Sequence, residues 1–250
     1  MESFENKILI VGIGLFLFVV FENLFPKEKF KFKEKLNRTF KNIFFWLINI
    51  GITPIIILPI TIFATTLNLH TTFQFENLIF QFFFHLVIYD LFLYFWHRAN
   101  HEIPFLWRFH HVHHLDETLD VSSGVRFHFG EVILSAIVRC ALIVTFNISL
   151  VHLLIIEAIV LISSAFHHSN IRLPEKLEQY LSYIIVTPSI HWVHHHKRQQ
   201  ETDANYCTIF SLWDLIFGTK STFKRYLGMP IGVENDTDQP VSKLITRPLK

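Results

Sequence analysis

Apolar residues gather in long runs along the chain, rather than in the spaced pattern of a helix that has one face in water. Residues 8–25 and 78–96 each form such a run, and residues 43–67 carry no charge at all. A membrane-spanning helix needs about 20 predominantly apolar residues. The three runs are therefore predicted to be transmembrane helices, and the run 43–67 is expected to be kinked or broken near Pro54 and Pro59.

The fourth apolar run, residues 132–166, has an intermediate length. As one helix it would extend about 52 Å, whereas the apolar core of a bilayer is about 30 Å thick. Two full spans would need about 40 residues. The run is therefore interpreted as a hairpin of two short or re-entrant helices that turns near residues 147–149. A hairpin returns the chain to the side of the membrane that it left.

Composition agrees with a protein of the bilayer. Hydrophobic residues make up 51% of the 250 positions, and 28 of them are phenylalanines, which is more apolar than a soluble domain of this length. The net charge of +1 argues against a nucleic-acid partner. The two cysteines, Cys140 and Cys207, lie far apart and suggest neither a disulfide framework nor a thiolate metal site. The first apolar run lacks a small-residue cleavage site, so it is expected to be a retained helix.

Charge predicts how the chain is oriented. The stretch Lys27–Lys41 holds seven basic residues and only two glutamates, and short loops this basic are normally cytoplasmic. The N-terminus is then outside, and the chain from His97 onward emerges in the cytoplasm. A catalytic region is expected over residues 97–218, followed by a tail over residues 219–250. We expect one domain, residues 1–250, of all-α class: a polytopic membrane helical bundle.

Histidine is the residue that a plain membrane bundle does not explain. There are 16 histidines, and 13 of them fall into four clusters between His97 and His196. The first cluster, His97-Arg98-Ala99-Asn100-His101, continues the third apolar run. Residues at positions i and i+4 lie on one face of a helix, so both imidazoles can reach one metal ion.

Two further clusters have the spacing HxxHH, which places three imidazole rings on one helix face. They consist of His110, His113 and His114, and of His191, His194 and His195. A looser cluster has His128 just before the hairpin and His167-His168 just after it. His111 and His196 are expected to be spare residues that point away. The hairpin brings all four clusters to the cytoplasmic face, so the bundle is predicted to carry a cytosolic, histidine-lined di-metal cap.

Ligand type alone does not choose the metal, because neutral imidazole suits iron, zinc, copper and nickel. Eight histidines in the three boxes exceed the four ligands of a structural zinc site and suit two adjacent metals. The sequence after His101 lacks the second histidine of a zinc-protease motif. No Glu-x-x-His occurs, which argues against a carboxylate-bridged di-iron bundle. A haem would need only one or two axial histidines.

The order and spacing of these boxes carry a resemblance to a known family. The run Asp90-x-x-x-Tyr94-x-x-His97-Arg98-x-x-His101 and the following Leu106-Trp107-x-x-His110-x-x-His113-His114 resemble the fatty acid hydroxylase/sterol desaturase superfamily. Further matching motifs are Arg126-x-His128 with Glu131, His168-Ser169-Asn170 with Leu173-Pro174, Thr187-Pro188-x-x-His191-x-x-His194-His195, Asp203-x-Asn205-Tyr206, and Trp213-Asp214-x-x-Phe217-Gly218-Thr219. The resemblance covers roughly residues 75–220. Phe129 departs from it, because the family commonly has proline there.

The resemblance implies a membrane di-metal oxygenase that acts on fatty acyl, sterol, carotenoid or ether lipids. It implies two iron ions and O2 as co-substrate, with zinc as a substitute in purified protein. The reaction would be hydroxylation or desaturation of a lipid C–H bond. Glu102 also resembles the alkylglycerol monooxygenase branch, so ether-lipid cleavage is an alternative. The implied direct metal ligands are His97, His101, His110, His113, His114, His191, His194 and His195, joined by His128 and His168.

Acidic residues near the boxes are candidates for catalytic or supporting roles. Asp90 lies seven residues before His97 inside an apolar helix, and ionisable residues in such helices are functional by default. Asp90 is expected to orient a ligand imidazole through its second ring N–H. Glu102 and Asp203 are weaker candidates, because acidic residues beside the boxes are often merely solvated. Arg139 and Glu157 are expected to form a structural pair across the hairpin.

Partners and location follow from what the chain lacks. It has no Gly-x-Gly-x-x-Gly turn for a nucleotide cofactor, so electrons are expected from a separate donor or a diffusible reductant. The expected location is the membrane, a bacterial inner membrane being favoured over the endoplasmic reticulum. Two other classes of function stay open: a histidine-rich divalent-metal transporter and a non-catalytic lipid-binding scaffold. The first would place its histidines at midplane depth, and the second would tolerate the loss of ligands.

Overall fold

The computed structural model describes residues 2–67, 73 and 75–249, with side chains from Val11 onward. Every regular element in this part of the chain is helical, which confirms the predicted all-α class. The helices in chain order are α1 (Glu2–Leu24), α2 (Phe32–Ile52), a π-helical turn (Thr53–Ile57), α3 (Leu58–Thr66), α4 (Leu78–Glu102), α5 (Pro104–His114), a 3-10 turn η2 (Val121–Val125), α6 (Phe129–Phe146), α7 (Leu150–His168), α8 (Glu175–Leu181), α9 (Pro188–His194), α10 (Gln199–Thr202), α11 (Leu212–Ile216), α12 (Val241–Thr246) and a final 3-10 turn (Arg247–Leu249).

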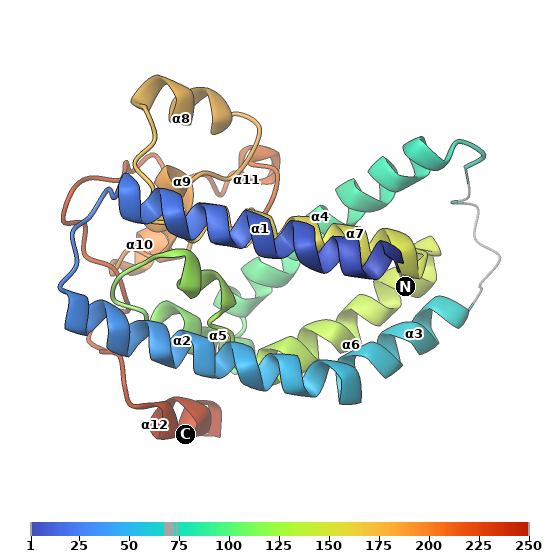
Figure 1. The fold of residues 1–250 in the computed structure, drawn as a ribbon, viewed down its shortest axis with the longest axis horizontal. Helices are drawn as coiled ribbons and strands as arrows, with labels where there is room; N and C mark the ends of the chain where they lie inside the picture. Colours follow the sequence, from blue (N-terminus) through green and yellow to red (C-terminus); the bar gives the residue numbers. More distant parts are fainter. Residues whose placement is uncertain (1, 68–72, 74, 250) are drawn as a thin grey trace.

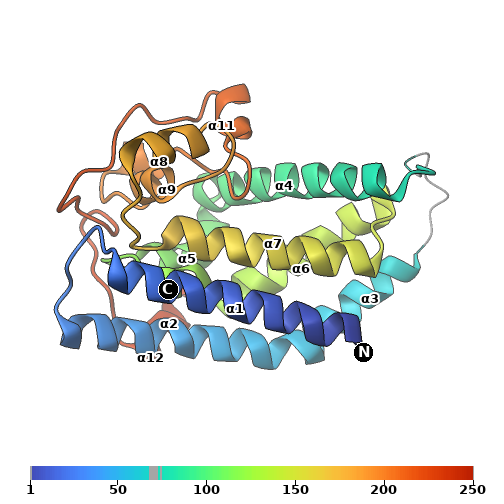
Figure 2. The ribbon, with the colours of Figure 1, turned by 45° about the horizontal axis from the view of Figure 1, so that its top comes forward.

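The long helices lie lengthwise beside one another, and the short helices gather at one end of them (Figures 1 and 2). Four stretches are long and apolar enough to cross a membrane: Phe32–Thr66, Leu78–Glu102, Phe129–Phe146 and Leu150–His168. Helix α1 contains a shorter apolar stretch, Val11–Leu24. The chain is thus a multi-pass membrane protein, and the short helices form a cap at one end of the bundle.

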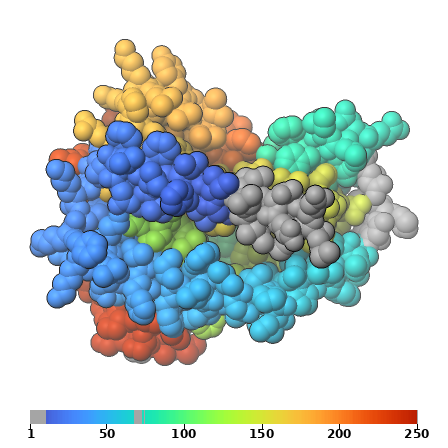
Figure 3. All heavy atoms as spheres, in the orientation of Figure 1, coloured from blue at the N-terminus to red at the C-terminus, as the bar shows by residue number. Residues whose placement is uncertain are grey.

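The second predicted span changes its helical geometry where its prolines lie. Helix α2 runs into the π-helical turn Thr53–Ile57, which contains Pro54, and α3 follows with Pro59 in its first turn. Proline lacks the backbone N–H and crowds the preceding turn, so a wider turn relieves the clash. Figure 3 shows α2 and α3 as one continuous ridge along this face. The predicted basic loop is shorter than expected, because α2 already begins at Phe32.

The predicted hairpin is present as α6 and α7. Asn147 ends α6 with a φ of 50°, in the left-handed region that asparagine tolerates. The hydroxyl of Ser149 then accepts a hydrogen bond from the backbone N–H of His152 and caps α7. The turn thus lies at the expected residues 147–149 and returns the chain to the cap at His168.

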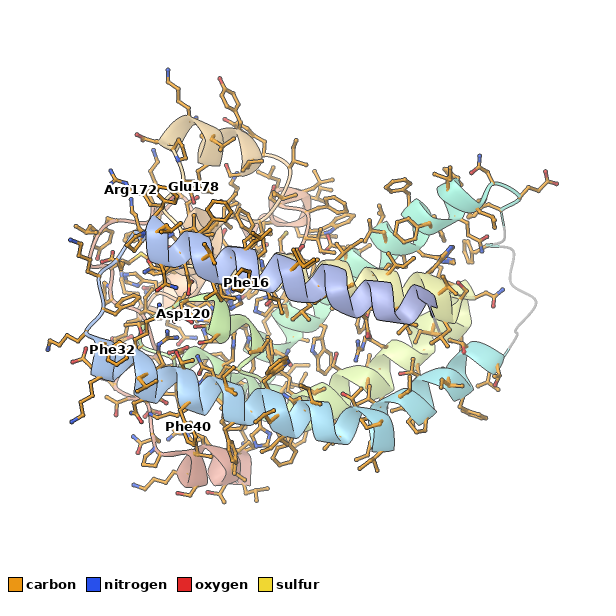
Figure 4. All side chains as sticks on the ribbon, in the orientation of Figure 1. Phe16, Phe32, Phe40, Asp120, Arg172 and Glu178 are labelled. Carbon is orange, nitrogen blue, oxygen red and sulfur yellow. The ribbon has the colours of Figure 1, made fainter. Side chains whose placement is uncertain are left out.

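Aromatic side chains cover the outside of the bundle. Phe32 and Phe40 extend away from α2 (Figure 4) and are 81% and 66% exposed. Exposed apolar surface on this scale is unusual for a protein in water but expected where lipid is the solvent. The phenylalanines therefore cover the surface that faces acyl chains.

A buried ionic cluster ties α2 to the cap. Arg38 donates hydrogen bonds to Asp116 and Ser123 at 3.0 Å and also contacts Asp120. Asn42 donates to Asp116 at 3.0 Å. Burial alone would raise the pKa of the Asp120 carboxyl, but Arg38 holds that pKa below its usual value. This cluster fixes the segment between α5 and α6, which follows the second histidine box.

The C-terminal region packs more firmly than the predicted tail. Asp238 accepts hydrogen bonds from Arg126 at 2.5 Å and from Lys41 at 2.7 Å. Leu244 of α12 is fully buried against Phe45 of α2. Within residues 219–250, a buried charge and a core leucine thus hold α12 against α2.

Replacement of Arg38 by methionine is expected to lower the free energy of unfolding by about 3 kcal/mol, because Asp116 and Asp120 would be left buried without their partner. SDS-induced unfolding in mixed micelles measures this change. The control is Lys31→Gln, which breaks an exposed ion pair with Glu34 and should change the free energy by less than about 0.5 kcal/mol. Equal effects of the two variants would contradict the anchoring role of Arg38.

Candidate metal centre

Nine histidines of the cap form two groups, in each of which the ligand nitrogens lie within 4.8 Å of one another. The first group consists of His97, His101, His110, His114 and His194, and the second of His113, His168, His191 and His195. Four helices supply them: α4, α5, α7 and α9, with His195 at the end of α9. Histidines that are up to 98 residues apart in sequence thus meet in one small volume.

The second group has the geometry of a metal site. Its Nε2 atoms face one another: 3.1 Å separates His168 from His113, 2.9 Å separates His191 from His168, and 3.1 Å separates His195 from His191. Two imidazole nitrogens that bind one metal at about 2.1 Å lie about 3 Å apart when their bonds meet at a right angle. The donor set therefore fits a metal ion at its centre.

The first group also contains buried ring nitrogens that face its centre or lack a hydrogen-bond partner. The Nε2 atoms of His101 and His194 are buried and have no hydrogen-bond partner, and buried polar atoms are rarely left so. The Nε2 atoms of His110 and His114 lie 3.2 Å apart. The ring of His97 lies 4.5 Å from the ring of His194, measured between centroids. A metal ion among these five rings would satisfy the orphaned nitrogens.

The opposite ring nitrogen, Nδ1, is held by an acceptor in six of the nine histidines. Such bonds set the tautomer and the orientation of a ligand imidazole. The acceptors are Tyr206 O for His97 (2.9 Å), Asp203 Oδ1 for His101 (3.3 Å), Glu131 Oε1 for His110 (2.9 Å), Arg126 O for His113 (3.2 Å), Ser164 O for His168 (2.8 Å) and Ala204 O for His194 (2.7 Å). Each bond turns Nε2 toward the centre of its group.

Burial lowers the pKa of several histidines in the two groups. Desolvation lowers the pKa of His113, His114, His191 and His195 well below the usual value, and neighbouring imidazoles lower it further. Desolvation also lowers the pKa of His194 to about 3. A folded-state pKa this low leaves the ring uncharged at pH 7, and the uncharged ring is the form that binds metal.

Glu131 is a supporting residue whose role the sequence did not reveal. It lies in the first turn of α6, accepts from His110 Nδ1 at 2.9 Å and from Asn100 at 3.3 Å, and is 5% exposed. A buried carboxylate beside a ligand imidazole raises the basicity of that ligand. Its position close after His128 in the family-like motif was the signal available.

The structure does not bring His128 to either group. Its Nδ1 accepts a hydrogen bond from the backbone N–H of Gly130, which caps α6, and its Nε2 lies 3.1 Å from the carbonyl oxygen of Ile245. His168, the other histidine predicted with it, lies within the second group. The neighbouring His167 belongs to neither group, although its ring packs against that of His191.

Asp90 supports the site indirectly. Its carboxylate accepts hydrogen bonds from the backbone N–H groups of Ile209 and Phe210, and from Trp213 Nε1 at 2.8 Å. The expected contact with a ligand imidazole is replaced by these bonds, because seven residues of helix separate Asp90 from His97 by about 10 Å. Asp90 instead anchors the segment after Tyr206, whose carbonyl oxygen holds His97.

The other predicted residues lie at the edge of the site. Glu102 forms an exposed ion pair with Arg98 at 2.7 Å, and its catalytic role stays a prediction. The exposed Asp203 contacts His101, as a supporting residue would. His196 lies outside both groups, and its Nδ1 accepts from the backbone N–H of Arg198.

Comparison with known proteins finds relatives whose names describe hydroxylases or monooxygenases. Over 227 residues, which is 87% of this chain and 67% of the relative, it is 28% identical to ornithine lipid hydroxylase OlsE of Rhizobium tropici. Over 132 residues it is 33% identical to the alkylglycerol monooxygenases of Homo sapiens and Danio rerio, covering 52% of this chain but only 28% of each relative. A cholesterol 25-hydroxylase-like protein of Danio rerio is 27% identical over 149 residues, which is 56% of this chain and 50% of the relative. No solved structure matches.

The family model for fatty acid hydroxylase matches residues 82–219, more than half of the chain. The matched region begins in α4 and ends after α11, so it contains all nine histidines of the two groups. The relatives are named as lipid hydroxylases and monooxygenases, which are oxidoreductases. The chain therefore belongs to the fatty acid hydroxylase family.

Proposed function

We propose that the protein binds two iron ions, one at each histidine group, and uses O2 to hydroxylate a C–H bond of a membrane lipid. The observation that carries this proposal is the cavity between the two groups and the membrane helices. It has a volume of about 340 Å³, and His97, His110, His113, His168 and His191 form part of its wall. The remainder of the wall comes mainly from α4, α6 and α7, which are three of the membrane-spanning candidates.

The cavity suits an acyl or other hydrocarbon segment. Leu93, Val132, Val160 and Leu161 are among the residues that line it, so a hydrocarbon placed against them loses contact with water and gains apolar contacts. Histidines of both groups form one part of the cavity wall. A lipid in this position presents a C–H bond to the metal pair while the rest of the molecule stays in the bilayer.

We propose the nine histidines of the two groups as the ligands, with His168 included and His128 left out. Imidazole nitrogen suits iron and several other divalent metals, and zinc would fit the same sites in purified protein. When bound, the two irons supply the activation of O2 that the protein's side chains cannot perform. The transporter alternative is disfavoured, because the histidines gather in the cap and at the ends of α4 and α7 beside it, rather than at the middle of the spans.

The protein's own residues would position the metal ligands and the lipid. The Nδ1 bonds hold six imidazoles in fixed orientations, and Glu131 balances charge beside His110. Apolar walls exclude water from the reacting C–H bond. Electrons come from a separate donor in this proposal. The basic start of α2 lies at the same end as the cap (Figure 1), so the active site is proposed to face the cytoplasm, in a bacterial inner membrane.

Hydroxylation is tested with purified, iron-loaded protein, a lipid extract, a chemical or protein reductant and isotopically labelled O2. The expected product is a lipid that has gained one labelled oxygen atom, detected by mass spectrometry. His113→Ala should abolish this product, because it removes a ligand of the second group. A product that has lost two hydrogens without gaining oxygen would identify a desaturase. Absence of any oxidised lipid from iron-loaded, reduced protein would contradict the proposal.

Metal content distinguishes the proposed roles of His128 and His168, the two histidines that flank the hairpin. His168→Ala is expected to lower the bound metal to about half, because it opens the second group, whereas His128→Ala should leave it unchanged. Elemental mass spectrometry on protein in mild detergent measures both. Metal loss in His128→Ala with full metal in His168→Ala would contradict the proposed ligand set.

Glu131→Gln is expected to weaken metal binding by at least about tenfold, since the amide does not supply the negative charge behind His110. Competition with a chelator measures the affinity. His196→Ala is the matched control, because His196 lies close to the site but outside both groups, and its metal affinity should equal that of the unaltered protein. Equal metal affinities of Glu131→Gln, His196→Ala and the unaltered protein would show that Glu131 does not support metal binding.

A further inference from the structure

The end of the cavity opposite the histidines is polar, although it lies within the membrane helices. Arg139 Nη1 donates hydrogen bonds to Glu157 Oε1 at 2.5 Å and to the Tyr89 hydroxyl at 2.8 Å. The Tyr89 hydroxyl in turn donates to Glu157 Oε1 at 3.3 Å. All three residues line the cavity, and each comes from a different helix: α4, α6 and α7. The predicted pair across the hairpin is thus confirmed, and it also forms part of the cavity wall.

The polar cluster lies deep in the bundle. On α4, Tyr89 precedes His97 by eight residues, and on α7, Glu157 precedes His168 by eleven. At 1.5 Å per helical residue, these separations are about 12 Å and about 16 Å along the helix axes. Two independent helices thus place the cluster at a similar distance from the metal centre, and the ion pair keeps Arg139 at that level.

Three zones follow one another along the cavity. The histidine end could hold metal and the deep end carries the ion pair. Leu93 lies between them on α4, and Val160, Leu161 and Ser164 lie between them on α7. Ionisable residues inside membrane helices are costly and usually functional. If the ion pair had only a structural role, both of its side chains would be expected to be buried by packing. The side chain of Glu157 is instead 39% exposed. The deep end therefore has hydrogen-bonding capacity to offer to a ligand.

We propose that Arg139, Tyr89 and Glu157 bind a hydroxyl group of the lipid substrate and so determine which carbon reaches the metal pair. The cluster of Arg139 and Glu157 is neutral overall, which favours an uncharged group. A hydroxyl fits both partners, because it accepts from Arg139 or Tyr89 and donates to Glu157. A phosphate or carboxylate would meet the like charge of Glu157. A plain hydrocarbon end would cover the exposed part of the Glu157 side chain without offering it a hydrogen bond.

This inference rests on the proposed function, because it takes the cavity to be the place of the substrate. It adds the substrate class: a neutral lipid with a hydroxyl about 12 to 16 Å from the carbon that is oxidised, as the helix rise implies. It also gives Arg139 and Glu157 a role in specificity that the pairing of α6 with α7 does not require.

Binding is tested apart from oxidation, with metal-free and metal-loaded full-length protein in mild detergent. Trp46 and Trp96 line the cavity, so a bromine atom beside them should quench their fluorescence. The probes are a long-chain alcohol brominated at the end opposite its hydroxyl, and the matching bromoalkane. The alcohol is expected to bind about tenfold more tightly, as one hydrogen bond to a charged group allows. Equal binding of the two probes would overturn the proposal.

Variants assign the preference to the cluster. Arg139→Met combined with Glu157→Leu replaces the ion pair by apolar residues, an exchange that buried pairs often tolerate. Tyr89→Phe removes only the hydroxyl and serves if the double variant does not fold. The double variant should bind the alcohol and the alkane with nearly equal affinity, and Tyr89→Phe, which keeps Arg139 and Glu157, should reduce the preference for the alcohol below tenfold. Lys31→Gln, which alters an exposed ion pair on α2, should keep the tenfold preference. An unchanged preference in the cluster variants would show that the cluster does not bind the hydroxyl.

The two proposals fail in different ways. One outcome is a preference for the alcohol that depends on Arg139 and Glu157, with no labelled oxygen incorporated into the lipid. This outcome would contradict the proposed oxidation but would still support the hydroxyl-binding site. Oxidation of alkane and alcohol at equal rates, at positions that the double variant does not change, would overturn the hydroxyl site alone. Oxidation of the alcohol at one position, spread over several positions in the double variant, is the expected result.

Discussion

The convergence of nine imidazoles in one small volume is the interaction on which the cap depends. Without metal, facing Nε2 atoms at 2.9 to 3.2 Å would leave buried polar groups without adequate partners. A metal ion in each group, as proposed, would turn the same arrangement into a set of strong bonds. Much of the surrounding structure holds the rings in place: backbone carbonyls accept from Nδ1, Glu131 supports His110, and the Arg38 cluster fixes the segment that follows α5.

The bundle forms the cavity that would give a substrate access to the proposed metals. Helices α4, α6 and α7 bring apolar side chains together beside the histidines, and they bring Arg139, Tyr89 and Glu157 together in the cavity wall. In the proposed function, a lipid would enter this cavity without leaving the membrane, and the polar cluster would limit how deep it reaches.

The sequence predicted the four spans from Phe32 onward and most of the histidines that the structure brings into the two groups, because both depend on local periodicity. The HxxxH of α4 and the two HxxHH boxes bring their histidines together, since i, i+3 and i+4 positions share a helix face. The positions of His128 and Asp90 could not be predicted in this way. His128 caps α6 instead of joining either group, and Asp90 bonds residues of a loop that is distant in sequence. Glu131 is equally non-local, because its partner His110 precedes it by 21 residues. The packing of α12 depends on Asp238 and Leu244, which have no signal in the apolar pattern.

The proposed function depends on two irons, one in each histidine group. The metal content of purified, iron-grown protein, determined by elemental mass spectrometry together with Mössbauer spectroscopy, tests this directly. About two irons per chain in nitrogen-rich environments are expected. Folded protein that binds no metal, or that binds one ion shared by all nine histidines, would contradict the proposed function.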